Sequence, residues 1–190
     1  MQNVFRADFL ESQQVFETFL SQASLFENLE KAAVFFIESI RNGGKIISCG
    51  NGGSMTDAMH FAEELSGKYQ KERKALPAIA ISDPSHITCV ANDYGFEYVF
   101  SRFVESVGNE EDTLLVISTS GKSPNIINAV QSAHKLGMST VALTGNKDAE
   151  VLQMVDVGIT VPHGGYSDRI QEVHTTIIHA LIHVIKQELL

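Results

Sequence analysis

The sequence predicts an α/β fold built on a doubly wound, five-stranded parallel sheet flanked by helices, with extra helices at the N-terminus. Short apolar segments alternate along the chain with longer segments of helical periodicity. The apolar segments are continuous runs, which is typical of parallel strands covered on both faces. With 190 residues the chain suits one domain. We expect residues 1–43 to form N-terminal helices and residues 44–190 to form the α/β core of that single domain.

The composition disfavours several classes of protein. The net charge of −9 makes nucleic acid a poor partner. Cys49 and Cys89 are too few for a disulfide framework, which favours a reducing compartment. The N-terminus has no basic segment followed by an apolar one, and no apolar run is long enough to span a bilayer. We therefore expect a cytoplasmic protein with no membrane or nucleic-acid partner.

Two amphipathic helices are expected before the first strand. Aromatic residues recur at helical spacing over residues 5–19. Ser24-Leu25-Phe26-Glu27 has the form of a capping box and predicts the start of the second helix, and Gly43 suits the position just beyond its end. The apolar stripe of the first helix can pack on its own domain or on another subunit, and the pattern leaves both open.

The segment Lys45–Leu65 predicts a strand, a glycine-rich turn and a helix. The glycines in Gly50–Gly53 allow positive φ values and a close approach of ligand to backbone. Ser54 is expected to cap the helix, whose free N–H groups then point at the loop. His60 and Glu64 are four residues apart and share one helix face. The segment thus offers a cradle for an anion or polyol, and two groups able to bind metal or move protons.

The rest of the chain supplies the other strands and the helices between them. Strands are expected over residues 78–82, 113–118, 139–145 and 157–161, the first of them buried. Helices are expected to begin after Asp83-Pro84, near Tyr98, after Pro124 and near Ser167. The last helix is apolar on nearly all sides, which predicts burial on several sides and a subunit interface.

Polar loops at the carboxyl ends of the strands are the expected ligand site, because ligands of such sheets bind there. Residues 118–123 place several hydroxyls around a glycine at a strand-to-helix junction, which suits a phosphate. An ordinary polar loop capped by Ser123 explains the same pattern equally well. The P-loop motif and the dinucleotide-binding glycine motif are both missing from the sequence, so neither kind of site is expected.

His60 and Glu64 taken alone fit a surface pair on a solvated helix face better than a metal site. The last helix changes that balance, because it carries a second group of polar residues: Gln171, Glu172, His174, His179 and His183. Histidines on an otherwise apolar helix need partners when they are buried.

Five segments together carry a resemblance to a known family. They are residues 48–54, 57–65, 91–96, 117–123 and 168–174. With them the chain resembles the sugar isomerase (SIS) domain family and, within it, the phosphoheptose isomerases, over nearly its whole length. The resemblance implies the flavodoxin-like SIS fold.

The resemblance also implies an activity. It is the conversion of sedoheptulose 7-phosphate to D-glycero-D-manno-heptose 7-phosphate, an early step of ADP-heptose and lipopolysaccharide core biosynthesis. It implies a homotetramer with one zinc ion per subunit, bound by His60, Glu64, Gln171 and His179. Glu64 is the implied catalytic base and His179 its acid/base partner, while Asp168 orients a histidine. The implied substrate contacts are Asn51, Gly52, Gly53, Glu64, Asn92, Asp93, Ser118, Thr119, Ser120, Ser123 and Gln171.

Two tensions follow from this assignment. Glu64 and His179 appear both as ligands and as catalysts, so either the metal moves when substrate binds or the two roles describe different states. Gln171 and His179 lie eight residues apart, which is about 12 Å along one helix. We therefore predict that ligands from more than one chain complete the site.

Three alternatives stay open at the level of the sequence. One is a non-catalytic relative that binds a replication initiator, although such members lack the acidic residue at the position of Glu64. Another is a sugar-phosphate-sensing module like those of transcriptional regulators, for which the chain leaves no room for a DNA-binding domain and has the wrong charge. The third is an isomerase acting on a different sugar phosphate.

Overall fold

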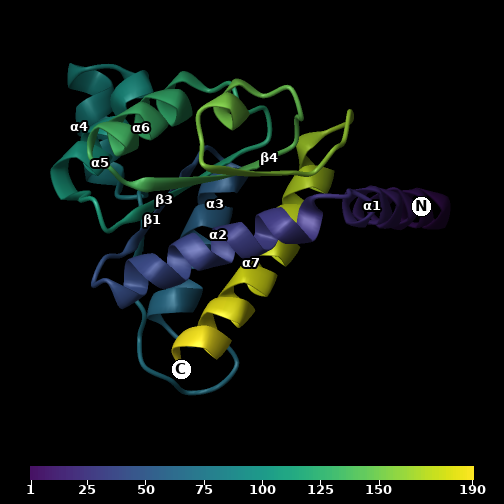
Figure 1. The fold of residues 1–190 in the computed structure, drawn as a ribbon. Coiled ribbons are helices and arrows are strands. Elements are labelled where there is room, and N and C mark those ends of the chain that lie inside the picture. Colours follow the sequence, from purple (N-terminus) through teal and green to yellow (C-terminus); the bar gives the residue numbers. More distant parts are fainter.

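Five strands form one all-parallel sheet in the order β2-β1-β3-β4-β5, which is the flavodoxin-like order (Figure 1). The computed structural model describes all residues, 1–190. The strands are β1 (Ile46–Gly50), β2 (Ala78–Ala80), β3 (Thr113–Ser118), β4 (Ser139–Thr144) and β5 (Val157–Thr160). The predicted fold class is confirmed.

Helices cover both faces of the sheet. They are α1 (Gln2–Leu20), α2 (Leu25–Arg41), α3 (Gly53–Ser66), α4 (Pro84–Asp93), α5 (Ser101–Val107), α6 (Pro124–Lys135) and α7 (Ser167–Leu189), with short 3₁₀ turns η1 (Phe96–Tyr98) and η2 (Glu150–Gln153). Buried residues of α1, α2, α3 and α7 share one core cluster, and those of α4, α5 and α6 share the other. Along β3, Leu115 and Ile117 belong to the first cluster, whereas Leu114 and Val116 belong to the second.

The second strand differs from the prediction. It ends at Ala80, two residues earlier than expected, and Ile79 is 40% exposed. β2 lies at the edge of the sheet and pairs only with β1, so it has one neighbouring strand instead of two. The central strands β1 and β3 are buried at every residue, as continuous apolar runs predict.

Two of the expected helix caps are also different. Ser24 precedes α2, but its side chain makes no capping hydrogen bond, and its φ of −95° and ψ of 4° depart from the extended geometry of a capping box. α3 begins at Gly53 after Gly52, which has a φ of 56°, so Ser54 lies buried inside the first turn and does not cap it. Asp83 does cap α4, since its side chain accepts a 2.8 Å hydrogen bond from the backbone N–H of His86.

The N-terminal half of α1 extends away from the rest of the molecule (Figure 1). Phe5 and Phe9 are 62% and 74% exposed there. Closer to the body, the guanidinium of Arg169 on α7 lies 3.3 Å from Asp8 and 3.2 Å from Glu11, and it anchors the middle of α1. None of the helices combines the length and the apolar character needed to cross a bilayer.

Candidate active site and metal centre

α3 and α7 run side by side in the same direction, and facing residues on the two helices bring the polar groups together. The side-chain amide of Gln171 lies against Gly53 at the start of α3, where a Cβ atom would come within 2.5 Å of Nε2. One turn further, the hydroxyl of Thr175 donates a 3.1 Å hydrogen bond to Asp57. One turn beyond that, His179 faces His60. The apolar residues between these positions pack on the sheet and fix this register.

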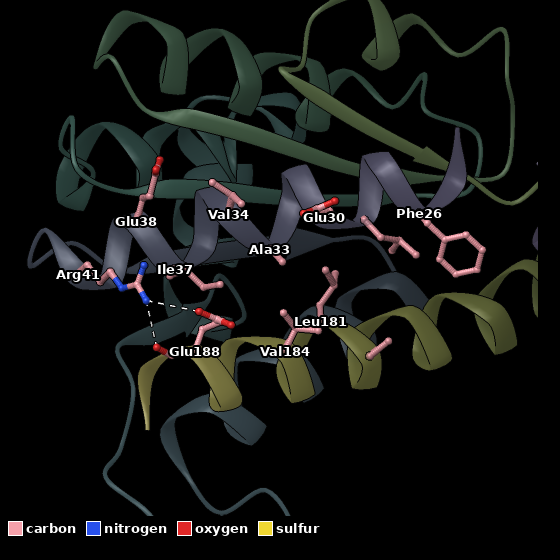
Figure 2. A pocket seen from close by; sticks show the side chains of 12 residues that line it. Phe26, Glu30, Ala33, Val34, Ile37, Glu38, Arg41, Leu181, Val184 and Glu188 are labelled. Atoms are coloured by element: carbon pink, nitrogen blue, oxygen red, sulfur yellow. Dashed lines mark hydrogen bonds and ion pairs between the residues drawn. The ribbon is translucent and has the colours of Figure 1, made fainter. Parts of the chain in front are cut away.

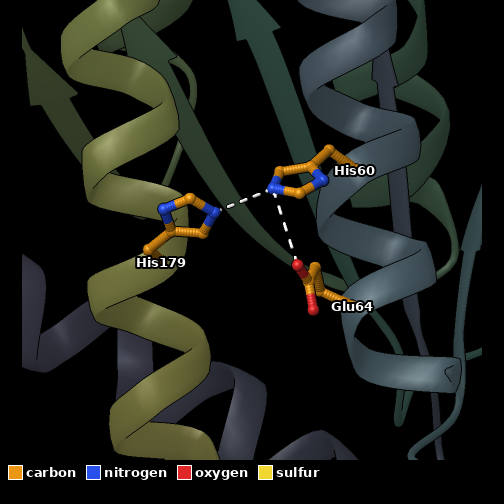
Figure 3. Close-up of side chains that lie close together, drawn as sticks. All are labelled: His60, Glu64 and His179. Carbon is orange, nitrogen blue, oxygen red and sulfur yellow. Dashed lines mark hydrogen bonds and ion pairs between the residues drawn. The ribbon is translucent and has the colours of Figure 1, made fainter. Parts of the chain in front are cut away.

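His60 and His179, together with Glu64, form a cluster of three possible metal ligands (Figure 3). Nε2 of His60 lies 2.8 Å from Nε2 of His179 and 3.8 Å from Oε1 of Glu64. Their ligand atoms all lie within 4.8 Å of one another. The side chains of His60 and Glu64 are 33% and 18% exposed, so the cluster is partly sheltered and still accessible. Two imidazoles and one carboxylate are a donor set that catalytic zinc sites use, so these residues fit a divalent ion.

Residues around the cluster hold its members in place. Nδ1 of His60 lies 3.1 Å from Oε1 of Glu63, so the other ring nitrogen is free to face the cluster. The ring of Tyr69 stacks on His179 at 6.2 Å between centroids. Arg73 donates hydrogen bonds to the backbone carbonyls of Glu64 and Leu65, which caps the end of α3 that carries Glu64.

A second part of the site lies where β1 and β3 end side by side. The chain leaves β1 toward α3 on one face of the sheet and leaves β3 toward α6 on the other, which makes this edge the topological switch point. The side-chain amides of Asn51 and Asn125 exchange two hydrogen bonds across it, of 3.0 and 2.9 Å. In open α/β sheets ligands bind in the crevice outside such strand ends, and here the glycine turn after β1 and the serine loop after β3 border that place.

The serine loop, Ser118–Ser123, turns at Gly121, whose φ is 60°. The hydroxyl of Ser118 accepts a 3.1 Å hydrogen bond from the N–H of Gly121 and braces the turn. Ser123 precedes α6, but its hydroxyl makes no capping hydrogen bond to the helix. Its hydroxyl therefore stays available to a ligand, whereas a structural cap would consume it.

Known proteins are similar to this chain over nearly its whole length. Residues 9–145 match the family model described as the SIS domain. The phosphoheptose isomerase of Cytophaga hutchinsonii is 57% identical over 180 residues, covering 95% of this chain and 94% of the relative. That of Proteus mirabilis is 52% identical over 99% of this chain and 98% of the relative.

The chain belongs to the phosphoheptose isomerase family of SIS-domain proteins.

Solved structures from this family have the same fold. The phosphoheptose isomerase of Neisseria gonorrhoeae is similar with a TM-score of 0.91 and 40% identity, and that of Francisella tularensis with a TM-score of 0.92 and 38% identity. Each comparison covers 98% of both chains. The match extends over the whole α/β fold and the N-terminal helices.

The residues that the family resemblance implied fall into separate groups in the structure. His60, Glu64 and His179 converge within one chain. Gln171 lies about two helical turns away beside Gly53, at the mouth of the crevice. Asn92 and Asp93 lie on the exposed end of α4, where the amide of Asn92 donates a 2.6 Å hydrogen bond to Asp93. No contact within the chain joins this pair to the other implied residues.

Asp168 was expected to orient a histidine, and no histidine lies against it within the chain. Its carboxylate is exposed and lies 4.0 Å from the guanidinium of its neighbour Arg169. Glu63 makes the contact with His60 instead. The sequence spacing could have suggested the contact between Glu63 and His60, because residues three apart share a helix face.

Asp57, Thr175 and Asn125 were not identified from the sequence. Asp57 lies three residues before His60 and is 8% exposed, and burial raises the pKa of its carboxyl. The spacing of Asp57 before His60 was available in the sequence, whereas the contact with Thr175 depends on how α3 and α7 pack.

Proposed function

We propose that this protein is a phosphoheptose isomerase that converts sedoheptulose 7-phosphate to D-glycero-D-manno-heptose 7-phosphate, the step that leads to ADP-heptose and the lipopolysaccharide core. The observation that carries the proposal is the convergence of His60, Glu64 and His179 in a chain that also places the serine loop, braced by Ser118, at the switch point of the sheet. The family membership and the 57% identity to a phosphoheptose isomerase support the choice of substrate.

The reaction moves a proton between two adjacent carbons. The carboxylate of Glu64 takes the proton from C1 of the ketose and returns it to C2 through an enediol. His179 gives a proton to the carbonyl oxygen on C2 and takes one from the hydroxyl on C1. Both side chains face the same small volume, so one base and one acid can act on neighbouring atoms.

The remaining residues bind and orient the substrate. We propose that Ser118, Thr119, Ser120 and Ser123 hold the phosphate at the start of α6. Asn51, Gly52, Gly53, Asn92, Asp93 and Gln171 are the proposed contacts to the sugar. Fixing the phosphate end places C1 and C2 near Glu64 without further ordering of the chain.

Zinc is the proposed cofactor, one ion per subunit, with His60, Glu64, Gln171 and His179 as ligands. The chemistry that zinc supplies here is Lewis-acid stabilisation of the oxygen that becomes negative. The His-Glu-His donor set supports this choice. Because Gln171 lies about two helical turns from the other three residues, completion of the ligand set from a second chain stays a prediction.

A homotetramer is proposed because two apolar surfaces lack a partner within the chain. One is the exposed stripe of α1 that includes Phe5 and Phe9. The other is a groove of about 680 Å³ between α2 and α7, lined by apolar residues such as Phe26, Leu181 and Val184 (Figure 2). Surfaces of this kind on one chain are typical of subunit interfaces. The cytoplasmic location likewise stays a prediction.

The non-catalytic alternatives are not favoured. Members that bind a replication initiator lack the acid at the position of Glu64, and this chain has that acid within the cluster. A sensing role would not require the convergence of a base and an imidazole on one volume.

The proposal is tested by a coupled assay of sedoheptulose 7-phosphate isomerisation. Metal-free protein, zinc-loaded protein, zinc-loaded Glu64→Gln and the surface control Glu72→Gln are compared. We expect turnover that depends on zinc, is lost in Glu64→Gln and is unchanged in Glu72→Gln. Binding of the sugar phosphate without turnover under any metal would instead support a sensing role.

A further inference from the structure

The reciprocal hydrogen bonds between Asn51 and Asn125 are the most strongly built contact in the crevice. Nδ2 of Asn51 donates to Oδ1 of Asn125 at 3.0 Å, and Nδ2 of Asn125 donates to Oδ1 of Asn51 at 2.9 Å. Asn125 is only 2% exposed. The two bonds fix both amide orientations at once, because reversing either amide would place donor against donor and acceptor against acceptor.

The pair joins elements that otherwise belong to different layers. Asn51 directly follows β1 and leads into α3, which packs on one face of the sheet. Asn125 is the second residue of α6, which packs on the opposite face. The bonds therefore tie the glycine turn to the start of α6 across the switch point, and no other hydrogen bond joins these two diverging segments.

We infer that Asn125 is a positioning residue for the sugar phosphate, acting through Asn51. Its amide sets the width of the crevice, so that the phosphate on the serine loop and the sugar on the glycine turn are bound at the separation that the substrate requires. The side chain of Asn51 serves this contact, and Asn51 and the turn that follows it present backbone N–H and C=O groups to the sugar.

This inference rests on the proposed function and changes one part of it. A direct contact from the Asn51 amide to the sugar is restricted to the second N–H and the second lone pair of the oxygen, because the donor and acceptor facing Asn125 are already used. Removing Asn125 leaves Asn51 unpaired in a partly buried position, where it can reorient and shift the turn.

A double-mutant cycle distinguishes a positioning role of Asn125 through Asn51 from a direct contact of the Asn51 side chain with the sugar. The variants are Asn51→Ala, Asn125→Ala and the double variant. The matched control is Asn128→Ala, which removes another asparagine of α6 that bonds only to the carbonyl of Glu97, at 2.9 Å. KM and kcat for sedoheptulose 7-phosphate and the melting temperature are measured for each zinc-loaded protein. Cobalt affinity is measured for each metal-free protein.

We expect each single variant to raise KM by about 10-fold with a smaller change in kcat, as the loss of a bonded pair predicts. The double variant should be no worse than either single one, and cobalt affinity should be unchanged, since the pair lies outside the His60 cluster. If Asn125→Ala is too unstable to assay, Asn125→Ser takes its place in the cycle.

Two results would overturn the inference. One is an additive cycle in which Asn51→Ala has the larger effect, because this indicates direct contact of Asn51 with the sugar. The other is a KM for Asn125→Ala equal to that of Asn128→Ala, with only the melting temperature lowered, because this indicates a structural role alone. Wild-type protein that neither binds nor isomerises the sugar phosphate would instead overturn the proposed function, and with it the role of the pair.

Discussion

Nε2 of His60 lies 2.8 Å from Nε2 of His179, although the two residues are 119 positions apart in the sequence. At this distance one imidazole donates its N–H and the other accepts it. The same two nitrogens, together with Oε1 of Glu64, are the atoms that would bind a divalent cation. The parallel pairing of α3 and α7 therefore creates the candidate metal centre.

Replacing His179 by alanine removes one of the three converging ligand atoms. We expect zinc binding, measured by competition with a chromogenic chelator, to fall below detection, because the remaining imidazole and carboxylate form an incomplete set. His183→Ala is the matched control, since His183 lies one turn further along α7 and bonds to Gln187 at 3.2 Å. Equal zinc affinities in the two variants would contradict the assigned centre.

Replacing Glu63 by alanine removes the carboxylate that orients His60 without touching the ligand atoms. We expect zinc affinity to fall about 10-fold, as is typical when a hydrogen-bond partner of a ligating histidine is lost. The control is Glu72→Ala, which replaces an exposed glutamate whose side chain makes no hydrogen bond or ion pair in the structure. An affinity that matches this control would mean that the 3.1 Å contact does not orient the ring.

Replacing Gly50 by alanine tests the tight turn after β1. A Cβ atom at this position would lie 2.4 Å from the backbone oxygen of Ser54 and 2.9 Å from that of Ile117. We expect the free energy of unfolding to fall by about 1–3 kcal/mol, and sugar-phosphate binding to weaken as the turn moves. Gly164→Ala is the control, because nothing lies within 4 Å of the corresponding Cβ. Equal urea midpoints for the two variants would refute the argument.

His174 should make stability depend on pH. It is fully buried on α7, and burial lowers its pKa from 6.5 to about 4. Between these values the unfolded chain binds a proton that the folded protein does not bind, so the free energy of unfolding decreases as the pH falls from about 6.5 to about 4. The full effect is about 3 kcal/mol.

The test of this dependence is a series of urea titrations across that pH range for wild type and His174→Met. The variant lacks the buried imidazole, so its free energy of unfolding should decrease less steeply with falling pH. Parallel curves for the two proteins would show that His174 does not cause the dependence.

The sequence by itself determined the order and type of the main elements. Continuous apolar runs predicted the presence of β1, and they predicted β3, β4 and β5 to within about one residue, because strands buried on both faces leave little room for polar residues. The local rules also placed His60 and Glu64 on one face of α3, since that depends only on helical periodicity. They were less reliable for β2 and for the start of α3, where an edge position and the close packing of Ser54 override local propensity.

Only the tertiary structure decided which distant groups meet. That His179 faces His60, that Gln171 lies at Gly53, and that Asn125 bonds to Asn51 all depend on how helices pack on the sheet. These contacts result from burial of apolar side chains on α3, α6 and α7. Such burial is non-directional, so the apolar pattern shows which faces are buried but not which partners they meet. The sequence therefore supplied the chemical groups of the site, and the packing of the core placed them together.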